Sequence, residues 1–352
     1  MSSILSLVRP EIVAMTAYSS ARNEQNVGEV WLNANESPWA HRHNLNRYPA
    51  PQPQSLQKLL SNIYQINSEN MLITRGSDEA IDILLRTFCT AGKDAIMTTP
   101  PTYGMYQIAA TIQGAEVIIV PLLKEQNFSL DVVEIVKQWR PAVKLIFFCS
   151  PNNPTGNLLA IQDILHLCET LKDKAIIVVD EAYIEFAESD SAVKYLHLYN
   201  NLVILRTLSK AYGMAGIRCG VAIANAELIS IFKKVIAPYP IPTVVAEIII
   251  AEFTAENREQ YQKQIQSIKQ QRQLLNDFLQ CCAWVKKVWP SQTNFILAEV
   301  HDADRLMNYC QSHGIVIRNR SKEYNLTNCV RITVGSPEEN SRLMEVLQHV
   351  KT

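Results

Sequence analysis

The sequence contains no apolar run that approaches the ~20 residues needed to cross a bilayer. Its first residues also lack a basic stretch followed by an apolar segment, so we expect no signal peptide. Lysine and arginine (33 residues) nearly balance aspartate and glutamate (34 residues), and no block of basic residues stands out. That balance argues against a general nucleic-acid surface. We therefore expect a protein that binds neither membranes nor nucleic acid.

The eight cysteines form no C-x-x-C pair and show no spacing typical of a zinc site. Most lie within apolar runs, as Cys149 does after Phe148, which is typical of reduced cysteines in a protein core. Reduced thiols of this kind are typical of the cytoplasm. The sequence therefore predicts a cytoplasmic protein without disulfides and without a metal site.

The 352 residues are 47% apolar and 19% charged, which indicates a globular chain long enough for two domains. From about residue 70 to 225, short β-branched runs alternate with segments of helical period. The expected strands are 71–74, 94–98, 115–121, 143–149, 175–180, 202–206 and 219–224, and the expected helices are 77–89, 103–112, 130–139 and 161–171. This alternation predicts an α/β fold whose mostly parallel sheet is covered by helices on both faces.

The pattern changes after residue 240. Residues 243–280 have helical character almost throughout, which suits a long helix between two domains. The segments that follow indicate a smaller α+β domain, with strands at 294–300, 315–318 and 330–334, and helices at 303–313 and from 337. We expect a large cofactor-binding domain over 46–240, and an interdomain helix with a small C-terminal domain over 241–352. Residues 1–45 are expected to form an arm that belongs to the small domain or contacts a partner subunit.

Glycine is scarce, with eleven residues in the chain. Six of them lie in segments near the ends of expected strands, namely Gly76, Gly104, Gly156, Gly213, Gly216 and Gly220. Glycine permits tight turns and close approach of the backbone to a ligand. This concentration therefore marks the strand ends as a candidate site.

One such segment is Thr207-Leu208-Ser209-Lys210, which leads into Gly216-Ile217-Arg218-Cys219-Gly220. Ligands of parallel sheets bind beyond the carboxyl ends of the strands. A lysine amine with a lowered pKa can form a Schiff base with an aldehyde, and hydroxyls and an arginine can bind a phosphate. Considered alone, however, a solvated loop lysine explains this segment better.

Two further strand ends carry polar residues. An apolar run ends at Asp180, which could pair with a protonated ring nitrogen, and Tyr183 follows within hydrogen-bonding reach of a ring oxygen. Asp180 is equally well explained as the cap of the next turn. In Ser150-Pro151-Asn152-Asn153-Pro154-Thr155-Gly156 the prolines restrict the backbone, so Asn153 could donate a fixed hydrogen bond to a ligand. An ordinary Pro/Gly turn is the alternative.

The remaining two segments contain Ser77 and Tyr103. Arg75-Gly76-Ser77-Asp78-Glu79 opens a helix, and the free N–H groups of a helix N-terminus bind phosphate. A well-capped helix would look the same. Tyr103 could stack on a flat ring or simply pack under its loop. Taken together, the five strand ends offer what a phosphorylated pyridine aldehyde requires: a phosphate cradle, a stacking ring, an oxygen partner, a counter-ion and an amine.

These motifs resemble those of the fold-type I, aspartate-aminotransferase-like superfamily, whose members use pyridoxal 5'-phosphate. Within it the chain is most similar to the histidinol-phosphate aminotransferase family. The resemblance extends over nearly the whole chain and includes Leu32-Asn33-Ala34-Asn35-Glu36, Asn46-Arg47-Tyr48-Pro49 and Arg331-Ile332-Thr333-Val334-Gly335.

The resemblance implies a role for each candidate residue. Lys210 would bind the cofactor and then move a proton, with Asp180 on the ring nitrogen and Tyr183 on the ring hydroxyl. The cofactor-binding residues would be Ser77, Asp78, Tyr103, Asn153, Asp180, Tyr183, Thr207, Ser209, Lys210 and Arg218. Tyr48 would reach the phosphate in the neighbouring subunit of a homodimer.

The resemblance also implies the substrates. The enzyme would interconvert histidinol phosphate and 2-oxoglutarate with imidazole-acetol phosphate and glutamate, in histidine biosynthesis. Arg331 and Arg318 would bind anions through their guanidinium groups, with Tyr18 and Asn33 as pocket walls. For Arg318, a surface arginine at a strand end is an equally good explanation.

Two alternatives remain open from the sequence. The same cofactor residues would serve an aromatic aminotransferase or a threonine-phosphate decarboxylase. A cofactor-binding regulator without catalysis is disfavoured because Lys210 and Asp180 are both present and no DNA-binding segment is appended.

Overall fold

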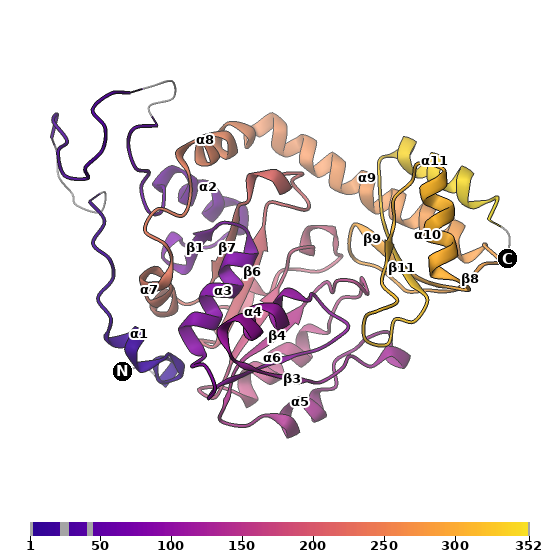
Figure 1. Ribbon diagram of the computed structural model, residues 1–352, viewed down its shortest axis with the longest axis horizontal. Coiled ribbons are helices and arrows are strands. Elements are labelled where there is room, and N and C mark those ends of the chain that lie inside the picture. Colours follow the sequence, from indigo (N-terminus) through magenta and orange to yellow (C-terminus); the bar gives the residue numbers. More distant parts are fainter. Residues whose placement is uncertain (1–2, 22–27, 41–44, 351–352) are drawn as a thin grey trace.

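The computed structural model of the chain describes residues 3–21, 28–40 and 45–350. A seven-stranded sheet between two helix layers forms the larger part, and a four-stranded sheet with its own helices forms the smaller part (Figure 1). Within these described ranges, no helix is both long enough and apolar enough to cross a membrane.

The large sheet has the strand order β1-β7-β6-β5-β4-β2-β3. Neighbours from β6 to β3 pair in parallel, whereas β7 is antiparallel to both β6 and β1. The prediction of a mostly parallel sheet is thus confirmed, with β7 running against the other strands. The strands are β1 (Met71–Thr74), β2 (Ala95–Thr98), β3 (Glu116–Ile119), β4 (Val143–Cys149), β5 (Ile176–Asp180), β6 (Leu202–Thr207) and β7 (Gly220–Ile223).

Helices cover both faces of this sheet. In β5, Ile177 and Val179 face one helix layer while Ile176 and Val178 face the other. Because both faces are buried, the strands are continuous apolar runs that the sequence reveals. One layer contains α2 (Gln54–Tyr64), α5 (Val132–Gln138), α6 (Ile161–Thr170) and α8 (Thr243–Glu252), and the other contains α3 (Ser77–Phe88), α4 (Met105–Gln113) and α7 (Ala226–Val235).

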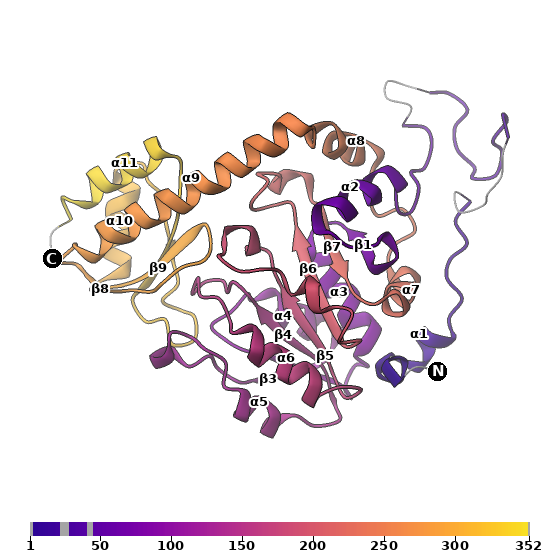
Figure 2. The same ribbon diagram turned by 180° about the vertical axis from the view of Figure 1, so that it is seen from behind.

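A long helix, α9 (Ala255–Gln280), joins the two parts of the molecule (Figure 2). The expected continuous helix over 243–280 is interrupted at Phe253–Thr254, where the Thr254 hydroxyl accepts the N–H of Asn257 and begins α9. In the smaller part, the antiparallel order is β10-β11-β9-β8, and Leu275 and Leu279 of α9 pack into its core. Its elements are β8 (Val285–Val288), β9 (Phe295–Val300), α10 (Ala303–Ser312), β10 (Arg318–Asn319), β11 (Cys329–Thr333) and α11 (Pro337–Leu347).

Several elements were not anticipated from the sequence. The helices α2 and α7 and the strand β8 are absent from the expected set, and the strand expected at 315–318 begins only at Arg318. In β8 the two central lysines are exposed and the flanking valines half-buried, so the strand lacks an alternating apolar pattern.

The arm lies against the larger domain in this chain. Ile4, Leu7 and Val8 are buried in the core under α3 and α7, and Lys234 donates a hydrogen bond to the Val13 carbonyl (2.9 Å). A short helix, α1 (Pro10–Ala14), follows. The start of the arm therefore packs on the larger domain, far from the second sheet (Figure 1). The membership of residues 1–45 in the smaller domain stays a prediction. The domain boundaries after residues 45 and 240 remain predictions.

Candidate active site

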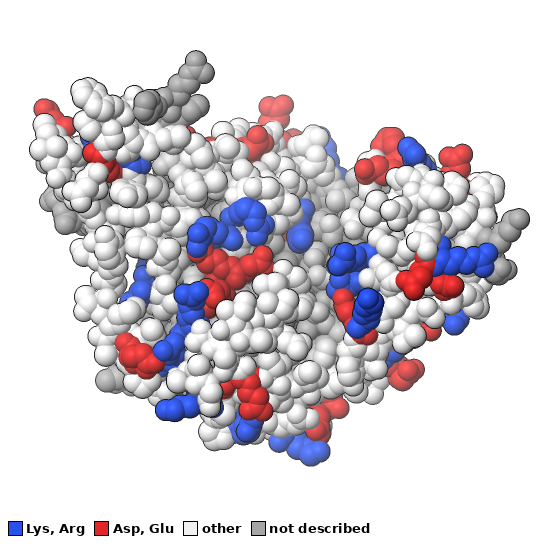
Figure 3. All heavy atoms as spheres, viewed as in Figure 1, with Lys and Arg blue, Asp and Glu red and all other residues white. Residues whose placement is uncertain are grey.

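A cavity of about 950 Å³ lies between the carboxyl edge of the large sheet and the loop after β10. Basic side chains gather where the smaller part faces the larger one (Figure 3). The residues that follow β1, β2, β4, β5 and β6 all line the cavity. Since β7 is antiparallel, its beginning lies at the same edge, which brings Arg218 to the cavity as well. The topology thus brings together residues that are far apart in the sequence, such as Asp78 and Arg218, which are separated by 140 residues.

Asp180 lies at the floor of the cavity and is 2% exposed. Its carboxylate accepts hydrogen bonds from the Tyr106 hydroxyl (2.8 Å) and from the Ala182 N–H (3.1 Å). Burial raises the pKa of Asp180 to about 6, although these two hydrogen bonds lower it. A buried carboxylate of this kind is stabilised by a cation placed against it.

Lys210 follows β6 and projects into the same cavity. Its Nζ lies 5.6 Å from the centre of the Tyr183 ring. Burial, followed by the positive charge of Arg331, lowers the pKa of Lys210, while Asp180 and Asp78 oppose that shift. A lysine with a lowered pKa is more often neutral and can act as a nucleophile or a base.

The N-terminus of α3 forms one end of the cavity. Gly76 has a φ of 77°, and a Cβ there would lie 2.7 Å from Arg218 Nη2. A Cβ on Gly220 would lie 2.5 Å from the Ser77 nitrogen, so β7 and α3 approach each other only because this residue is glycine. The free N–H groups at the start of α3 therefore lie beside the guanidinium of Arg218, which is the arrangement that binds phosphate.

Hydroxyl and carboxylate groups complete this end. The Thr207 hydroxyl donates to Ser209 Oγ (3.0 Å) and accepts the Ser209 N–H (3.1 Å). Asp78 accepts hydrogen bonds from the Tyr103 hydroxyl (2.9 Å) and from Arg218 (3.3 Å). The predicted phosphate-binding residues Ser77, Asp78, Thr207, Ser209 and Arg218 are therefore brought together around one end of the cavity.

Aromatic and amide side chains line the centre. The Tyr183 ring packs edge-on against Phe295 of β9, and burial raises the pKa of Tyr183. Asn153 follows β4, and its Oδ1 accepts a hydrogen bond from Arg331 Nη1 (2.6 Å). That contact leaves the Asn153 amide N–H₂ as the donor available to a ligand.

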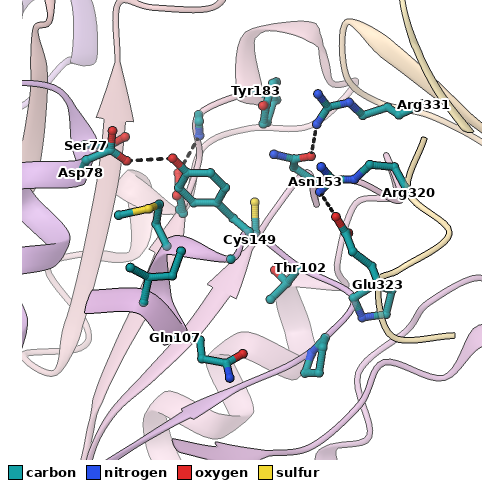
Figure 4. Close-up of a pocket in the computed structure, with 18 of the residues that line it drawn as sticks. Ser77, Asp78, Thr102, Gln107, Cys149, Asn153, Tyr183, Arg320, Glu323 and Arg331 are labelled. Carbon is teal, nitrogen blue, oxygen red and sulfur yellow. Dashed lines mark hydrogen bonds and ion pairs between the residues drawn. The ribbon is translucent and has the colours of Figure 1, made fainter. Parts of the chain in front are cut away.

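The opposite end of the cavity belongs to the smaller part. In Figure 4, Ser77 and Asp78 lie at one side, and Arg331, Arg320 and Glu323 lie at the other. Arg331 is partly buried over the Phe295 ring (5.2 Å), and its Nε has no hydrogen-bond partner in the part of the chain that the structure describes. Burial and then the charge of Arg320 lower the pKa of Arg331. Arg318 also lines the cavity.

Three predicted site residues lie elsewhere in the single chain. Tyr18 and Asn33 belong to the arm, Tyr48 follows it in the sequence, and none of the three is among the residues that line the cavity. Tyr48 stacks on Tyr239 with a centroid distance of 4.5 Å and is half exposed, and Asn33 hydrogen-bonds the Ala21 carbonyl (3.2 Å). Their roles remain predictions, and for Tyr48 the predicted role lies in the site of a neighbouring subunit. His41 and His43 lie outside the described residues.

Some residues on both sides of the cavity were not predicted from the sequence. Tyr106 lies in a predicted segment, but only the structure shows that its hydroxyl holds Asp180. Arg320 and Glu323 belong to no recognised sequence motif. The turn that links them, after β10, places both in the cavity wall. Charged residues packed into one short segment, 318–323, were the available signal. In the described part of the chain, no group of three or more His, Cys, Asp or Glu side chains could hold a metal ion.

The chain matches the family of class I and II aminotransferases over residues 13–347. It is 42% identical to the histidinol-phosphate aminotransferase of Francisella philomiragia, with 99% of this chain and 96% of that protein aligned. It is also 42% identical to histidinol-phosphate aminotransferase 1 of Pasteurella multocida, with 99% of each chain aligned.

Solved structures agree on the fold. The histidinol-phosphate aminotransferase of Clostridium acetobutylicum superposes with a TM-score of 0.78 at 25% identity, over 87% of this chain and 90% of that one. The Sinorhizobium meliloti enzyme, solved in complex with pyridoxal-5'-phosphate, superposes with a TM-score of 0.77 at 21% identity, over 87% and 84%. The large helix-covered sheet and the smaller domain are thus those of fold-type I transferases, and the chain belongs to the class I and II aminotransferases.

Proposed function

We propose that the chain is a pyridoxal-phosphate-dependent aminotransferase that interconverts histidinol phosphate and 2-oxoglutarate with imidazole-acetol phosphate and glutamate. One observation carries the proposal: a lysine with a lowered pKa and a buried carboxylate lie between a phosphate cradle and a wall of arginines. Relatives 42% identical over nearly the whole chain are histidinol-phosphate aminotransferases, which supports the choice of substrate.

The cavity residues fit the cofactor. Asp180 is buried and has a raised pKa, so a protonated ring nitrogen would supply the cation that this carboxylate lacks. The close approach at Gly76 and Gly220 keeps the α3 N-terminus and Arg218 open to a phosphate. Tyr103 would lie against the ring, with Asn153 and Tyr183 near its oxygen. When bound, pyridoxal phosphate supplies an aldehyde that captures amines and a ring that accepts electrons.

The chain's own groups then perform the proton transfer and the orientation. Lys210, whose pKa burial lowers, would hold the cofactor and take up or release the proton at the substrate's α-carbon. Arg331, fixed by Asn153 and Phe295, would bind a substrate anion and set the α-carbon over Lys210. Arg318 would add a second positive charge at that end of the cavity.

The exposed side chains of the N-terminal segments suggest how the enzyme assembles. We propose a homodimer in which Tyr48 of one subunit reaches the cofactor phosphate of its neighbour, since Tyr48 is half exposed and is not among the residues that line its own cavity. The arm also exposes Tyr18, Leu32 and Trp39, which suits a surface that a partner covers. A cytoplasmic enzyme of histidine biosynthesis is the setting we propose.

A panel of donors and acceptors tests the substrate. Purified protein with pyridoxal phosphate is expected to transaminate imidazole-acetol phosphate with glutamate as donor. Rapid transamination of phenylpyruvate without any reaction of the phosphate ester would instead indicate an aromatic aminotransferase. Release of carbon dioxide from threonine phosphate would indicate the decarboxylase, and a bound cofactor without any turnover would indicate a regulator.

A further inference from the structure

The cavity wall contributed by the smaller domain carries an excess of positive charge. Arg318 lies directly opposite Arg331 in the pairing of β10 with β11. Arg320 continues this ladder, because its N–H donates to the Cys329 carbonyl (2.8 Å). Residues two apart on a strand share a face, so three guanidinium groups lie on one side of the sheet. Like charges opposite each other destabilise a sheet, and an anion bound among them would relieve that repulsion.

One carboxylate faces these arginines among the residues that line the cavity. Glu323 Oε1 lies 2.5 Å from Arg320 Nη2, and the Glu323 N–H donates to the Arg320 carbonyl (3.0 Å), so one turn carries both side chains. Burial raises the pKa of Glu323, while Arg320, Arg331 and Arg318 all lower it. Glu323 is therefore the local counter-ion of the whole group.

The ion pair leaves polar atoms unsatisfied. Among the described residues, Arg320 Nε and Glu323 Oε2 are buried without a hydrogen-bond partner, as is Arg331 Nε in the same wall. A guanidinium bound to one carboxylate oxygen can still donate from its other N–H groups. The guanidinium groups of this wall thus retain N–H donors beyond the one that binds Glu323, which suits an acceptor-rich anion.

We propose that Arg320 is a specificity-determining residue that binds the distal anion of the substrate, and that Glu323 holds Arg320 until a dianionic group displaces it. The inference rests on the proposed function, since it assigns Arg320 to the phosphorylated end of that substrate. A phosphate monoester carries three acceptor oxygens and a charge of roughly −1.5 to −2 near neutral pH, so it competes well with one carboxylate for a guanidinium. A substrate that ends in a single carboxylate competes less well.

A purely structural role for the Arg320–Glu323 ion pair predicts different results from a role in substrate binding. If Arg320 and Glu323 only held the turn together, then removing either side chain would have the same effect on every substrate. If instead Glu323 competes with the substrate for Arg320, removing the two side chains has opposite effects on the phosphorylated substrate. This difference in sign separates the two roles.

The test compares Arg320→Gln, Arg320→Lys and Glu323→Gln in the holoenzyme, with histidinol phosphate and unphosphorylated histidinol as amino donors. Arg320→Gln is expected to raise the KM for histidinol phosphate about tenfold, the loss of roughly one charged hydrogen bond, with kcat and the KM for histidinol unchanged. Arg320→Lys is expected to recover part of that loss, and Glu323→Gln to lower the KM for histidinol phosphate.

The matched control is Arg305→Gln, which removes one exposed positive charge from α10 of the same domain outside the cavity. It is expected to leave both KM values unchanged. Equal KM increases in Arg320→Gln and Glu323→Gln, or a loss shared by both donors, would overturn the assignment of Arg320.

Inhibition by inorganic phosphate separates this inference from the proposed function. The inhibition constant is measured with whichever donor the enzyme uses, and it is expected to rise in Arg320→Gln and fall in Glu323→Gln. Absence of turnover with histidinol phosphate would refute the proposed function alone. Turnover of that substrate with an unchanged KM and an unchanged inhibition constant in Arg320→Gln would refute the inference alone.

Discussion

The two ends of the cavity differ in charge. At the balanced end, formed by the large sheet, carboxylates and cations are equal in number, whereas at the unbalanced end, formed by the smaller domain, cations outnumber carboxylates. At the end formed by the large sheet, Asp78 pairs with Arg218, and Asp180 lies in the same cavity as Lys210. At the end formed by the smaller domain, the described residues that line the cavity include one carboxylate, Glu323, and four cations, Arg318, Arg320, Lys322 and Arg331. The first end suits one resident group of mixed charge, whereas the second suits anions that exchange during each catalytic cycle.

The largest effect is expected at the balanced end, from Lys210→Ala. If Lys210 is the group that holds the cofactor and moves the proton, its loss should lower kcat by about 10²–10⁴-fold and change the absorbance band of the bound cofactor. Steady-state kinetics and a visible spectrum of the purified variant measure both. The control is Lys263→Ala on α9, whose side chain is 70% exposed and pairs with Glu259. Turnover retained in Lys210→Ala would mean that Lys210 is not the group that holds the cofactor and moves the proton.

Asp180→Asn separates stability from activity at the same end. The pKa of Asp180 is raised from 3.8 to about 6 by burial. In the cofactor-free protein, ionised Asp180 therefore lowers the free energy of unfolding. This destabilisation grows as the pH rises from about 4 to about 6 and reaches its full size above pH 6. At pH 7 the asparagine variant should therefore be more stable without cofactor, by up to about 3 kcal/mol, and much less active. Urea unfolding of both proteins at pH 4 and pH 7 measures the difference. A variant that is less stable at pH 7 would show that a cation already balances Asp180.

At the unbalanced end, Arg331→Gln should weaken anion binding. Loss of the charged hydrogen bonds is expected to raise the KM for glutamate and for histidinol phosphate by about 10–100-fold. Arg331→Lys should not restore binding, because the planar guanidinium contacts Asn153 and lies over Phe295 at once. The KM values of Arg331→Gln and Arg331→Lys are measured with glutamate and with histidinol phosphate. A change in the KM for one substrate alone would mean that Arg331 does not serve both half-reactions.

Gly220→Ala tests the close approach that shapes the phosphate cradle. Its added Cβ would lie 2.5 Å from the Ser77 nitrogen, which should destabilise the protein by about 1–3 kcal/mol and weaken retention of the cofactor. Gly216→Ala is the matched control, since nothing lies within 4 Å of its Cβ position. Thermal unfolding and cofactor titration compare the two variants. Equal stability would mean that β7 can shift without opening the cradle.

The smallest effect is expected from Tyr48→Phe, which removes one hydroxyl. If that hydroxyl reaches the neighbouring subunit's phosphate, the cofactor dissociation constant should rise by about five- to tenfold, the value of one hydrogen bond. Mixing Tyr48→Ala with Lys210→Ala should restore activity to one site of each mixed dimer. No recovery on mixing, in protein shown to exchange subunits, would place Tyr48 outside the partner's site.

The sequence anticipates the balanced end better than the unbalanced one, for a physical reason. Asp180, Asn153 and Lys210 each follow a continuous apolar run, and the shared direction of parallel strands carries them to one edge. Arg320 and Glu323 come together through a turn whose geometry leaves no apolar pattern. The hydrogen bond from Tyr106 to Asp180 likewise depends on how α4 packs against the sheet, which local pattern does not encode. For the arm, the sequence cannot distinguish packing on its own chain from packing on a partner.

The ratio of kcat/KM for histidinol phosphate to kcat/KM for histidinol shows whether the cavity recognises the phosphate of its substrate. If the arginine-rich end of the cavity recognises a phosphate, the phosphorylated donor should be preferred by about 10²-fold or more, and rising salt should reduce the preference. Equal kcat/KM values for the two donors at every salt concentration would mean that these arginines do not recognise the phosphate.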